Sequence, residues 1–296
     1  MHSESLTKHH GLAAALLSAA LSGVATIFAA GAVRELSPLL VIGTGQLAGA
    51  LLLIAMARQG QVPLKRSALH DNAFLLIRLI ILRGVLSAGL FGIGLGMTES
   101  IKAVFFTKIE PYFVLAWGAL VHGERHRPAE YVLLAVHVLG ALVLSTGGDL
   151  STFGQSQLGD LCIVTAMAIS GTTYAASRKL VELAGARYAG ALTVGGGACI
   201  VLPIALIASG DRLVTASMEG WLYQAVHVVL FYVAALPLWF HALSSVKGWV
   251  VSALRAVGPL AGAPVAYLLF GETLSGTQLL GGLAVVLTSA LISRYR

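Results

Sequence analysis

Three ionisable side chains lie within stretches that are otherwise long and apolar enough to cross a bilayer. Lys108 and Glu110 lie in residues 101–124, IKAVFFTKIEPYFVLAWGALVHGE, and Arg255 lies in residues 248–272, GWVVSALRAVGPLAGAPVAYLLFGE. At about 1.5 Å of rise per residue, Glu110 lies roughly 13 Å from the start of its stretch, near the middle of a hydrocarbon layer about 30 Å thick. An ionisable group at that depth faces a protein interior or a water-filled cavity, so it indicates a binding site or an ion path.

These charges predict a cavity for an anionic or zwitterionic solute. Lys108 and Glu110 are two positions apart, about 200° around a helix, so they cannot pair on one face and at least one needs a distant partner. We expect Lys108, Arg255 and Arg83 to line a central cavity of net positive charge that suits a carboxylate. Glu110 would be the coupling group: its protonation, or its contact with an ammonium group, would be linked to transport. The alternatives are a buried structural network and snorkelling of the two arginines to the cytoplasmic interface.

Aromatic and proline residues in the spans are further candidates. Aromatic side chains would give the cavity a wall, although aromatics in membrane spans more often serve packing or anchor the interface. Pro111 and Pro259 each leave an upstream carbonyl without its helical N–H partner, so they act as hinges between rocking halves or as fixed kinks. The candidate aromatic contacts are Tyr112, Phe113, Trp117, Tyr174, Trp239 and Tyr267.

The two charged stretches are copies of each other. Pro111 and Pro259 are 259 − 111 = 148 residues apart, and the Gly-Glu pairs that end the two stretches have the same offset. Gly11 and Gly159, near the starts of two other apolar segments, are also 148 residues apart. One ungapped offset that holds in separate places predicts two copies of a unit of about 140 residues.

Composition places the chain in a membrane. Hydrophobic residues make up 57% of it and charged residues 11%, whereas soluble domains have about 25% charged residues. The net charge of +6 then reflects basic cytoplasmic loops and does not indicate nucleic-acid binding. We predict no metal and no cofactor. The expected partners are a small solute, a proton or counter-solute, and the bilayer, while the oligomeric state stays open, a monomer included.

Ten continuous apolar runs predict an all-α polytopic membrane protein with ten transmembrane helices. Barrel strands would alternate apolar and polar residues instead. We expect a first five-helix repeat in residues 1–147, a connector in residues 148–157 and a second repeat in residues 158–296. The predicted spans are 11–33, 38–57, 74–97 (or from 79), 101–124, 129–146, 158–177, 188–208, 221–243, 248–270 and 275–292.

Basic residues in the loops predict that both termini are cytoplasmic. Twelve Lys and Arg residues lie in loops and tails on the side of the N-terminus, against three on the other side. Cytoplasmic loops carry this excess in multi-pass proteins. Because each copy has five spans, an odd number, the second copy enters the membrane from the opposite side. Such inverted repeats are typical of alternating-access transporters, whose sites lie near the midplane between the halves.

The repeated pattern also resembles a known family. A central proline, then Gly-Glu, then a glycine-rich apolar span occurs as IEPYFVLAWGALVHGE and again as VGPLAGAPVAYLLFGE. This pattern is similar to the paired EamA repeats of the drug/metabolite transporter superfamily, and the likeness covers nearly the whole chain. It implies two inverted five-helix repeats with cytoplasmic termini. It also implies movement of amino acids, other metabolites or drugs, often outward and coupled to a proton or another solute.

We therefore predict a secondary active transporter, an exporter, in the bacterial inner membrane. It would move an amino acid or other carboxylate-bearing metabolite by alternating access, without enzymatic activity. The alternative is a membrane-embedded enzyme that acts on a lipid-linked substrate with Glu110 as acid or base, and a non-transporting sensor is less favoured. The sequence contains no GxSxG, HExxH or P-loop motif, which weighs against a hydrolase or an ATP-driven pump.

Overall fold

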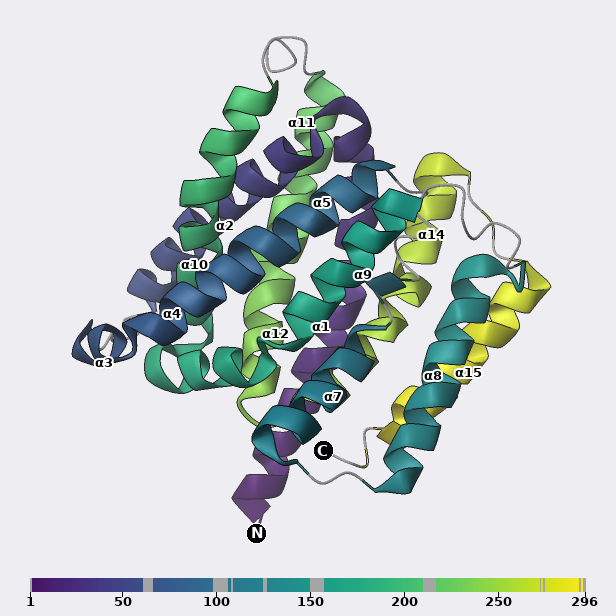
Figure 1. The fold of residues 1–296 in the computed structure, drawn as a ribbon. Coiled ribbons are helices and arrows are strands. Elements are labelled where there is room, and N and C mark those ends of the chain that lie inside the picture. The colour runs from purple at the N-terminus through teal and green to yellow at the C-terminus, as the bar shows by residue number, and fades with distance from the viewer. Residues whose placement is uncertain are drawn as a thin grey trace.

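The structure is a computed structural model of the 296-residue chain. The residues that it describes are 2–60, 66–97, 106–107, 109–124, 127–149, 157–209, 217–271, 273, 275–292 and 294. Within these ranges the chain forms helices and no strand (Figure 1), so the all-helical prediction is confirmed. Five of the described helices are long and apolar enough to span a membrane, and five shorter apolar helices accompany them. The five long segments are His9–Glu35, Pro38–Gln59, Ala73–Met97, Tyr174–Ala208 and Met218–Leu243.

Both copies are built from short and long helices with similar interruptions. The first copy contains α1 (His2–Glu35), α2 (Pro38–Gln59), α3 (Arg66–Asp71), α4 (Ala73–Leu79), the π-helix η1 (Ile80–Ser87), α5 (Ala88–Met97), α7 (Glu110–His122) and α8 (Pro128–Thr146). The second contains α9 (Gln157–Gly171), α10 (Tyr174–Ser209), α11 (Met218–His227), the π-helix η4 (Val228–Ala235), α12 (Leu236–Leu243), α13 (Gly248–Leu254), the 3₁₀-helix η5 (Arg255–Val257), α14 (Gly258–Phe270) and α15 (Gly276–Ile292). Most of the predicted connector, residues 150–156, lies outside the described residues.

The structure repeats at the same offset as the sequence. The two π-helices begin 228 − 80 = 148 residues apart, α7 and α14 begin 258 − 110 = 148 apart, and α8 and α15 begin 276 − 128 = 148 apart. The helix contacts repeat as well: α1 packs on α14 as α9 packs on α7, and α1 packs on η4 as α9 packs on η1. Helices α8 and α15 lie side by side, and α2 packs on α10 (Figure 1). The two copies are therefore related by a pseudo-two-fold exchange.

A pair of equivalent hydrogen bonds joins the copies at their π-helices. Ser87 Oγ donates to the carbonyl oxygen of Ala166 over 2.9 Å, and Ser18 Oγ donates to the carbonyl oxygen of Ala235 over 2.7 Å. These residues are partners in the repeat, because 166 − 18 = 148 and 235 − 87 = 148. The pseudo-two-fold relation between the copies thus holds for individual buried hydrogen bonds as well as for helix packing.

The predicted sixth span ends earlier than expected. Helix α9 stops at Gly171, Thr172 and Thr173 form a turn, and α10 begins at Tyr174, so the prediction of one helix to residue 177 was wrong at its end. Two arginines from the first copy hold the turn: Arg78 donates to the Thr172 carbonyl over 3.4 Å, and Arg83 donates to Thr173 Oγ1 over 2.8 Å. Arginine side chains of the first copy therefore supply hydrogen bonds at the turn between α9 and α10. An apolar run in the sequence does not reveal such a turn.

The two repeated prolines lie at helix starts. Pro111 is in the first turn of α7 and Pro259 is in the first turn of α14, where a missing N–H leaves no helical bond unmade. The span at residues 248–270 is accordingly divided into α13, η5 and α14. The prolines thus mark breaks in the spans, and their role as hinges stays a prediction.

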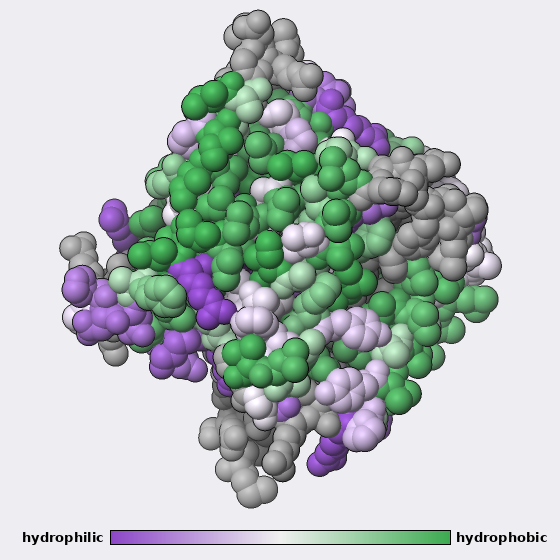
Figure 2. All heavy atoms as spheres, in the orientation of Figure 1, coloured by the Kyte–Doolittle hydropathy of each residue, from purple (hydrophilic) through white to green (hydrophobic). Residues whose placement is uncertain are grey.

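The outer surface suits a hydrocarbon environment. Large apolar side chains such as Leu120 (84% exposed), Ile207 (85%) and Leu268 (78%) point away from the protein. Figure 2 shows hydrophobic residues over much of the visible face, with strongly hydrophilic residues toward its margins. Exposed apolar patches of this extent are characteristic of contact with lipid or a partner. Together with the five long apolar helices, this surface identifies a multi-pass membrane protein.

A close glycine contact between α1 and α14 gives a first prediction. A Cβ added at Gly23 would clash with the backbone carbonyl of Gly258, whereas one added at Gly89 would meet nothing within 4 Å. We expect Gly23→Ala to destabilise the fold by about 1–3 kcal/mol because the helices must separate. The thermal unfolding midpoint of the detergent-solubilised protein measures the effect, with Gly89→Ala as the control. Equal midpoints for the two variants would contradict the packing.

Candidate functional site

A cavity of about 300 Å³ lies between the two copies. Its wall includes residues of α1, α2, η1, α5 and α7 from the first copy, and of α9, α10, η4, α12 and α14 from the second. Ligand pockets for small molecules range from about 300 to 1,000 Å³, so the cavity has the size of a small metabolite. The cavity lies where the sequence analysis expects a transport site, and its use as such a site stays a prediction.

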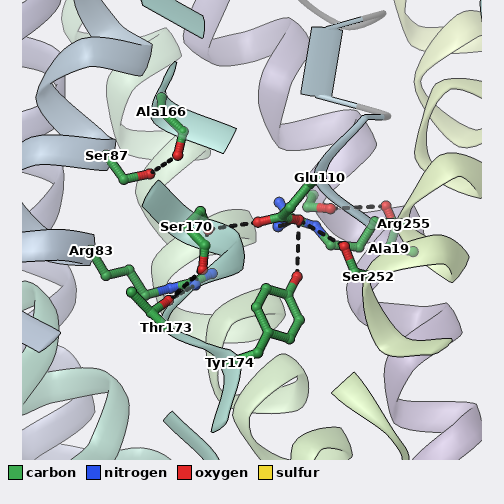
Figure 3. Close-up of polar contacts among 11 residues, drawn as sticks. Ala19, Arg83, Ser87, Glu110, Ala166, Ser170, Thr173, Tyr174, Ser252 and Arg255 are labelled. Carbon is green, nitrogen blue, oxygen red and sulfur yellow. Dashed lines mark hydrogen bonds and ion pairs between the residues drawn. The ribbon is translucent and has the colours of Figure 1, made fainter. Parts of the chain in front are cut away.

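Glu110 is the centre of a polar cluster at this cavity. Its side chain is buried and accepts one hydrogen bond on Oε1 and three on Oε2. All the donors come from the second copy (Figure 3). The contacts are Ser170 Oγ to Oε1 at 2.6 Å, and Tyr174 OH at 2.9 Å, Ser252 Oγ at 3.1 Å and Arg255 Nη1 at 3.2 Å to Oε2. We call these five residues the Glu110 cluster.

Interrupted helices bring the cluster together. Glu110 is the first residue of α7, Tyr174 is the first residue of α10, and Arg255 follows the last residue of α13. A carboxylate in the first turn of a helix and a cation at a helix C-terminus are each stabilised by the helix dipole. The breaks near the prolines therefore place opposite charges in favourable positions, and the Glu110–Arg255 pair forms across the two copies.

Arg83 lies beside the cluster and interacts electrostatically with Glu110, but unlike Arg255 it is not in direct contact with that carboxylate. From η1, its Nη1 donates to Ser170 Oγ over 3.0 Å and to Thr173 Oγ1 over 2.8 Å. Its guanidinium carbon lies 3.9 Å from the ring centroid of Trp239, within the range of cation–π attraction. Among the residues that the structure describes, Arg83 forms no ion pair with a carboxylate.

The three described charges give the cavity a net positive charge. Two cations, Arg83 and Arg255, share one anion, Glu110, which is in contact with Arg255. All three residues line the cavity, and both guanidinium groups donate hydrogen bonds to residues of other helices or turns. Lys108, the fourth predicted charge, lies outside the described residues.

The predicted aromatic residues divide into two groups. Tyr174 and Trp239 are buried and meet edge to face, with ring centroids 5.2 Å apart beside Arg83. Tyr112, 37% exposed, and Trp117 do not line the cavity. Tyr267, 58% exposed, is not among the lining residues either. The structure thus brings Glu110, Arg255, Arg83, Tyr174 and Trp239 together and leaves the other aromatic candidates apart.

Several polar residues at the site were missed by the sequence reasoning. Ser170, Thr173 and Ser252 supply hydroxyl groups to Glu110 and Arg83, and Gln46 lines the cavity wall. Ser170 has a signal in the repeat, because Ser22 lies 170 − 22 = 148 residues before it. The others carry no such signal, since single hydroxyl groups are common in membrane helices.

Comparison with known proteins confirms the resemblance. The EamA-like transporter family matches two stretches of this chain, residues 9–146 and 157–294. The matched stretches begin 157 − 9 = 148 residues apart, the offset seen in the sequence and in the helices. Together they include the cavity residues of both copies.

Similar proteins are named as transporters. An uncharacterized transporter of Methanothermobacter thermautotrophicus is 26% identical over 81% of this chain and 69% of its own length. The uncharacterized inner membrane transporter YedA of Escherichia coli K12 is 25% identical over 88% and 83%. The pseudopaline exporter CntI of Pseudomonas aeruginosa PAO1 is 24% identical over 84% and 83%. A solved crystal structure with 18% identity matches 97% of this chain and 97% of its own with a TM-score of 0.74, which supports the fold.

Proposed function

Because this chain belongs to the EamA-like transporter family, we propose that it is a secondary transporter that moves a small carboxylate-bearing metabolite across the inner membrane. The arrangement is that of ten spans in two inverted repeats with both termini in the cytoplasm. The repeats rock around the cavity and expose it to one side at a time. The family and its named members support transport, and the pseudo-two-fold exchange of helix contacts supports two similar halves that move against each other.

The observation that carries the choice of solute is that Arg83 and Arg255 share the single carboxylate of Glu110. One positive charge is left over, and an anion that enters the cavity balances it. The guanidinium group presents donors in a planar fork that matches a carboxylate. Arg83 uses Nη1 for Ser170 and Thr173 and also interacts with the Tyr174 side chain, so its remaining N–H groups are the ones that would meet a solute. An amino acid or another small carboxylate has this chemistry and fits the volume.

The Glu110 cluster closes contacts between the repeats and must rearrange during transport. Glu110 belongs to the first copy, and its four donors belong to the second. Rocking of one copy against the other separates these partners. In the conformation described here both oxygens of Glu110 are occupied, so a coupling role through protonation would operate in the opened conformation. One relative is named an exporter, which supports outward movement.

Uptake into proteoliposomes tests this function. We expect saturable uptake of amino acids or small carboxylates, and uptake at least about tenfold slower for the corresponding amides, because an amide lacks the charge that pairs with Arg83. A pH gradient across the liposome membrane tests coupling to protons, and protein-free liposomes are the control. If no carboxylate accumulates and the protein in detergent forms a product from lipid, the transporter proposal is wrong and the membrane-embedded enzyme is favoured.

A further inference from the structure

The first part of helix α10 is separate from the span that follows it. At about 1.5 Å of rise per residue, the 36 residues of α10 would measure roughly 54 Å, whereas a hydrocarbon layer is about 30 Å thick. The backbone leaves helical geometry at Gly185, with φ 76° and ψ 161°, and the helix turns there (Figure 1). Residues 186–209 are long enough to cross the bilayer by themselves. We call residues 174–184 the surface segment.

Charged side chains distinguish the surface segment from the span. Residues 188–209 contain no charged side chain, whereas the surface segment contains Arg178, Lys179 and Glu182. Each of these three side chains is about half exposed, and Glu182 pairs with both cations, with Lys179 over 3.4 Å and with Arg178 over 4.0 Å. The opposite face of the segment is apolar and belongs to the protein core. Its buried residues include Leu180, Val181 and Ala184.

The first copy has no counterpart of this charged face. Arg178 and Lys179 correspond to Ala30 and Gly31, because 178 − 30 = 148 and 179 − 31 = 148. Both small residues are buried in α1, which continues to Glu35, whereas α9 ends before the surface segment begins. The repeat unit therefore does not require these charges, and they are specific to the segment that leaves the helix bundle.

Two further arginines lie at the end of the surface segment. Arg187 Nη1 donates to the carbonyl oxygen of Met56 over 3.1 Å, which joins this end of the segment to the end of α2. Arg58 lies in the last turn of α2, and both arginines are exposed. We call Arg58, Arg178, Lys179 and Arg187 the basic patch. Residues 174–187 and the last turn of α2 contain one acidic residue, Glu182, so the patch has an excess of positive charge.

The basic patch lies beside a surface that suits lipid. Helix α4 packs on α10, and its Phe74 and Ile77 side chains are strongly exposed. Cations next to exposed apolar side chains at the ends of spans are typical of the membrane interface. At the other end of the bundle (Figure 1), Arg34 is accompanied by Glu35 in α1 and by Glu219 in α11, which packs on α1. Those three charges have no positive excess.

We propose that the basic patch binds the phosphate groups of anionic phospholipids, and that this binding stabilises the surface segment in the position described. The loop charges predict that this end of the protein meets the cytoplasmic leaflet, which is anionic and attracts Lys and Arg side chains near its surface. Guanidinium groups also match the oxygen atoms of a phosphate in pairs.

The surface segment connects this lipid site to the cavity. It begins with Tyr174, whose hydroxyl donates to Glu110 Oε2 over 2.9 Å, and it follows Thr173, which accepts a hydrogen bond from Arg83. Headgroups bound along the segment therefore stabilise the contacts of the Glu110 cluster, and the anionic lipid content of the membrane regulates the transport cycle. This second part of the inference rests on the proposed function, whereas the lipid site does not.

Thermal unfolding of the full-length protein in nanodiscs tests the lipid site. One set of nanodiscs contains phosphatidylcholine alone, and the other contains phosphatidylcholine and phosphatidylglycerol in equal amounts. We expect the unfolding midpoint to be about 5 °C higher with phosphatidylglycerol and the difference to shrink at high salt. In Arg178→Gln/Lys179→Gln we expect this difference to fall by more than half, because two of the four cations are lost.

Two control variants separate lipid binding from other effects of charge. Arg178→Lys/Lys179→Arg keeps both positive charges and is expected to keep the difference between the lipids. Arg34→Gln removes an exposed cation at the opposite end and is also expected to keep it. Equal wild-type midpoints in both lipids, or a full difference in Arg178→Gln/Lys179→Gln, overturns the basic patch as a lipid site.

Uptake into proteoliposomes of the same two compositions tests the connection to the cavity. We expect wild-type uptake of a transported carboxylate to be about fivefold slower with phosphatidylglycerol, since the stabilised contacts must open in every cycle. In Arg178→Gln/Lys179→Gln the two rates are expected to be similar. Equal wild-type rates, with the midpoint difference intact, overturn the connection and leave the lipid site. Absence of any uptake overturns the proposed function, and the midpoints still decide the lipid site.

Discussion

Replacement of Arg83 by glutamine is expected to weaken the binding of carboxylate-bearing solutes by about a hundredfold, since it removes charge-assisted hydrogen bonds together with the excess positive charge of the described cavity residues. Lysine at this position keeps the charge but not the planar fork, so Arg83→Lys is expected to recover part of the affinity. Dissociation constants for a carboxylate and its amide measure the effect, and the loss should be confined to the carboxylate.

Arg78 provides the matched control for this variant. It lies in α4, two residues before η1 begins, and donates to the Thr172 carbonyl over 3.4 Å, in the turn that also contacts Arg83, but it does not line the cavity. Arg78→Gln is therefore expected to keep the preference for carboxylate over amide. If folded Arg83→Gln keeps the wild-type preference for carboxylate over amide, Arg83 does not bind the carboxylate.

Replacement of Glu110 by glutamine is expected to lower the free energy of unfolding by about 2–3 kcal/mol. The change leaves the Arg255 guanidinium without its counter-ion, and breaking a fully buried pair costs about 3–5 kcal/mol. We take a smaller value because the Arg255 side chain is 30% exposed, so solvent screens part of the lost attraction. Chemical denaturation followed by tryptophan fluorescence measures the change.

A double-mutant cycle identifies the pair as the cause. Glu110→Gln/Arg255→Gln removes both charges, so the double variant is expected to be more stable than the sum of the single effects predicts. Glu182→Gln is the control, because Glu182 pairs with Lys179 at 3.4 Å on the exposed surface, and such pairs contribute little. Additive effects of the two buried substitutions would show that the charges do not stabilise each other.

The repeat in the sequence was sufficient to predict much of the fold. The offset between Pro111 and Pro259 recurs in the starts of α7 and α14 and in both π-helices, because equivalent sequences meet equivalent partners in the two copies. The prolines were expected within helices, and they lie instead in first turns. Apolar periodicity does not reveal such breaks, since both halves of an interrupted span remain apolar.

The charged part of the site was predicted better than its aromatic and hydroxyl parts. Intramembrane charges need partners, so Glu110 and Arg255 could be expected at one cavity although 145 residues separate them. Aromatic side chains carry no such requirement, and Tyr112 faces outward while Trp239 packs under Arg83. The hydroxyl groups of Ser170 and Ser252 reach Glu110 from two different helices, and such contacts follow only from the three-dimensional structure.

The structure of the protein with a transported carboxylate bound, determined by electron cryomicroscopy or crystallography, tests the account most directly. The account predicts the solute in the cavity between the repeats, with its carboxylate oxygens within hydrogen-bonding distance of the Arg83 guanidinium group. A solute bound outside this cavity, or one whose carboxylate points away from Arg83, would contradict it.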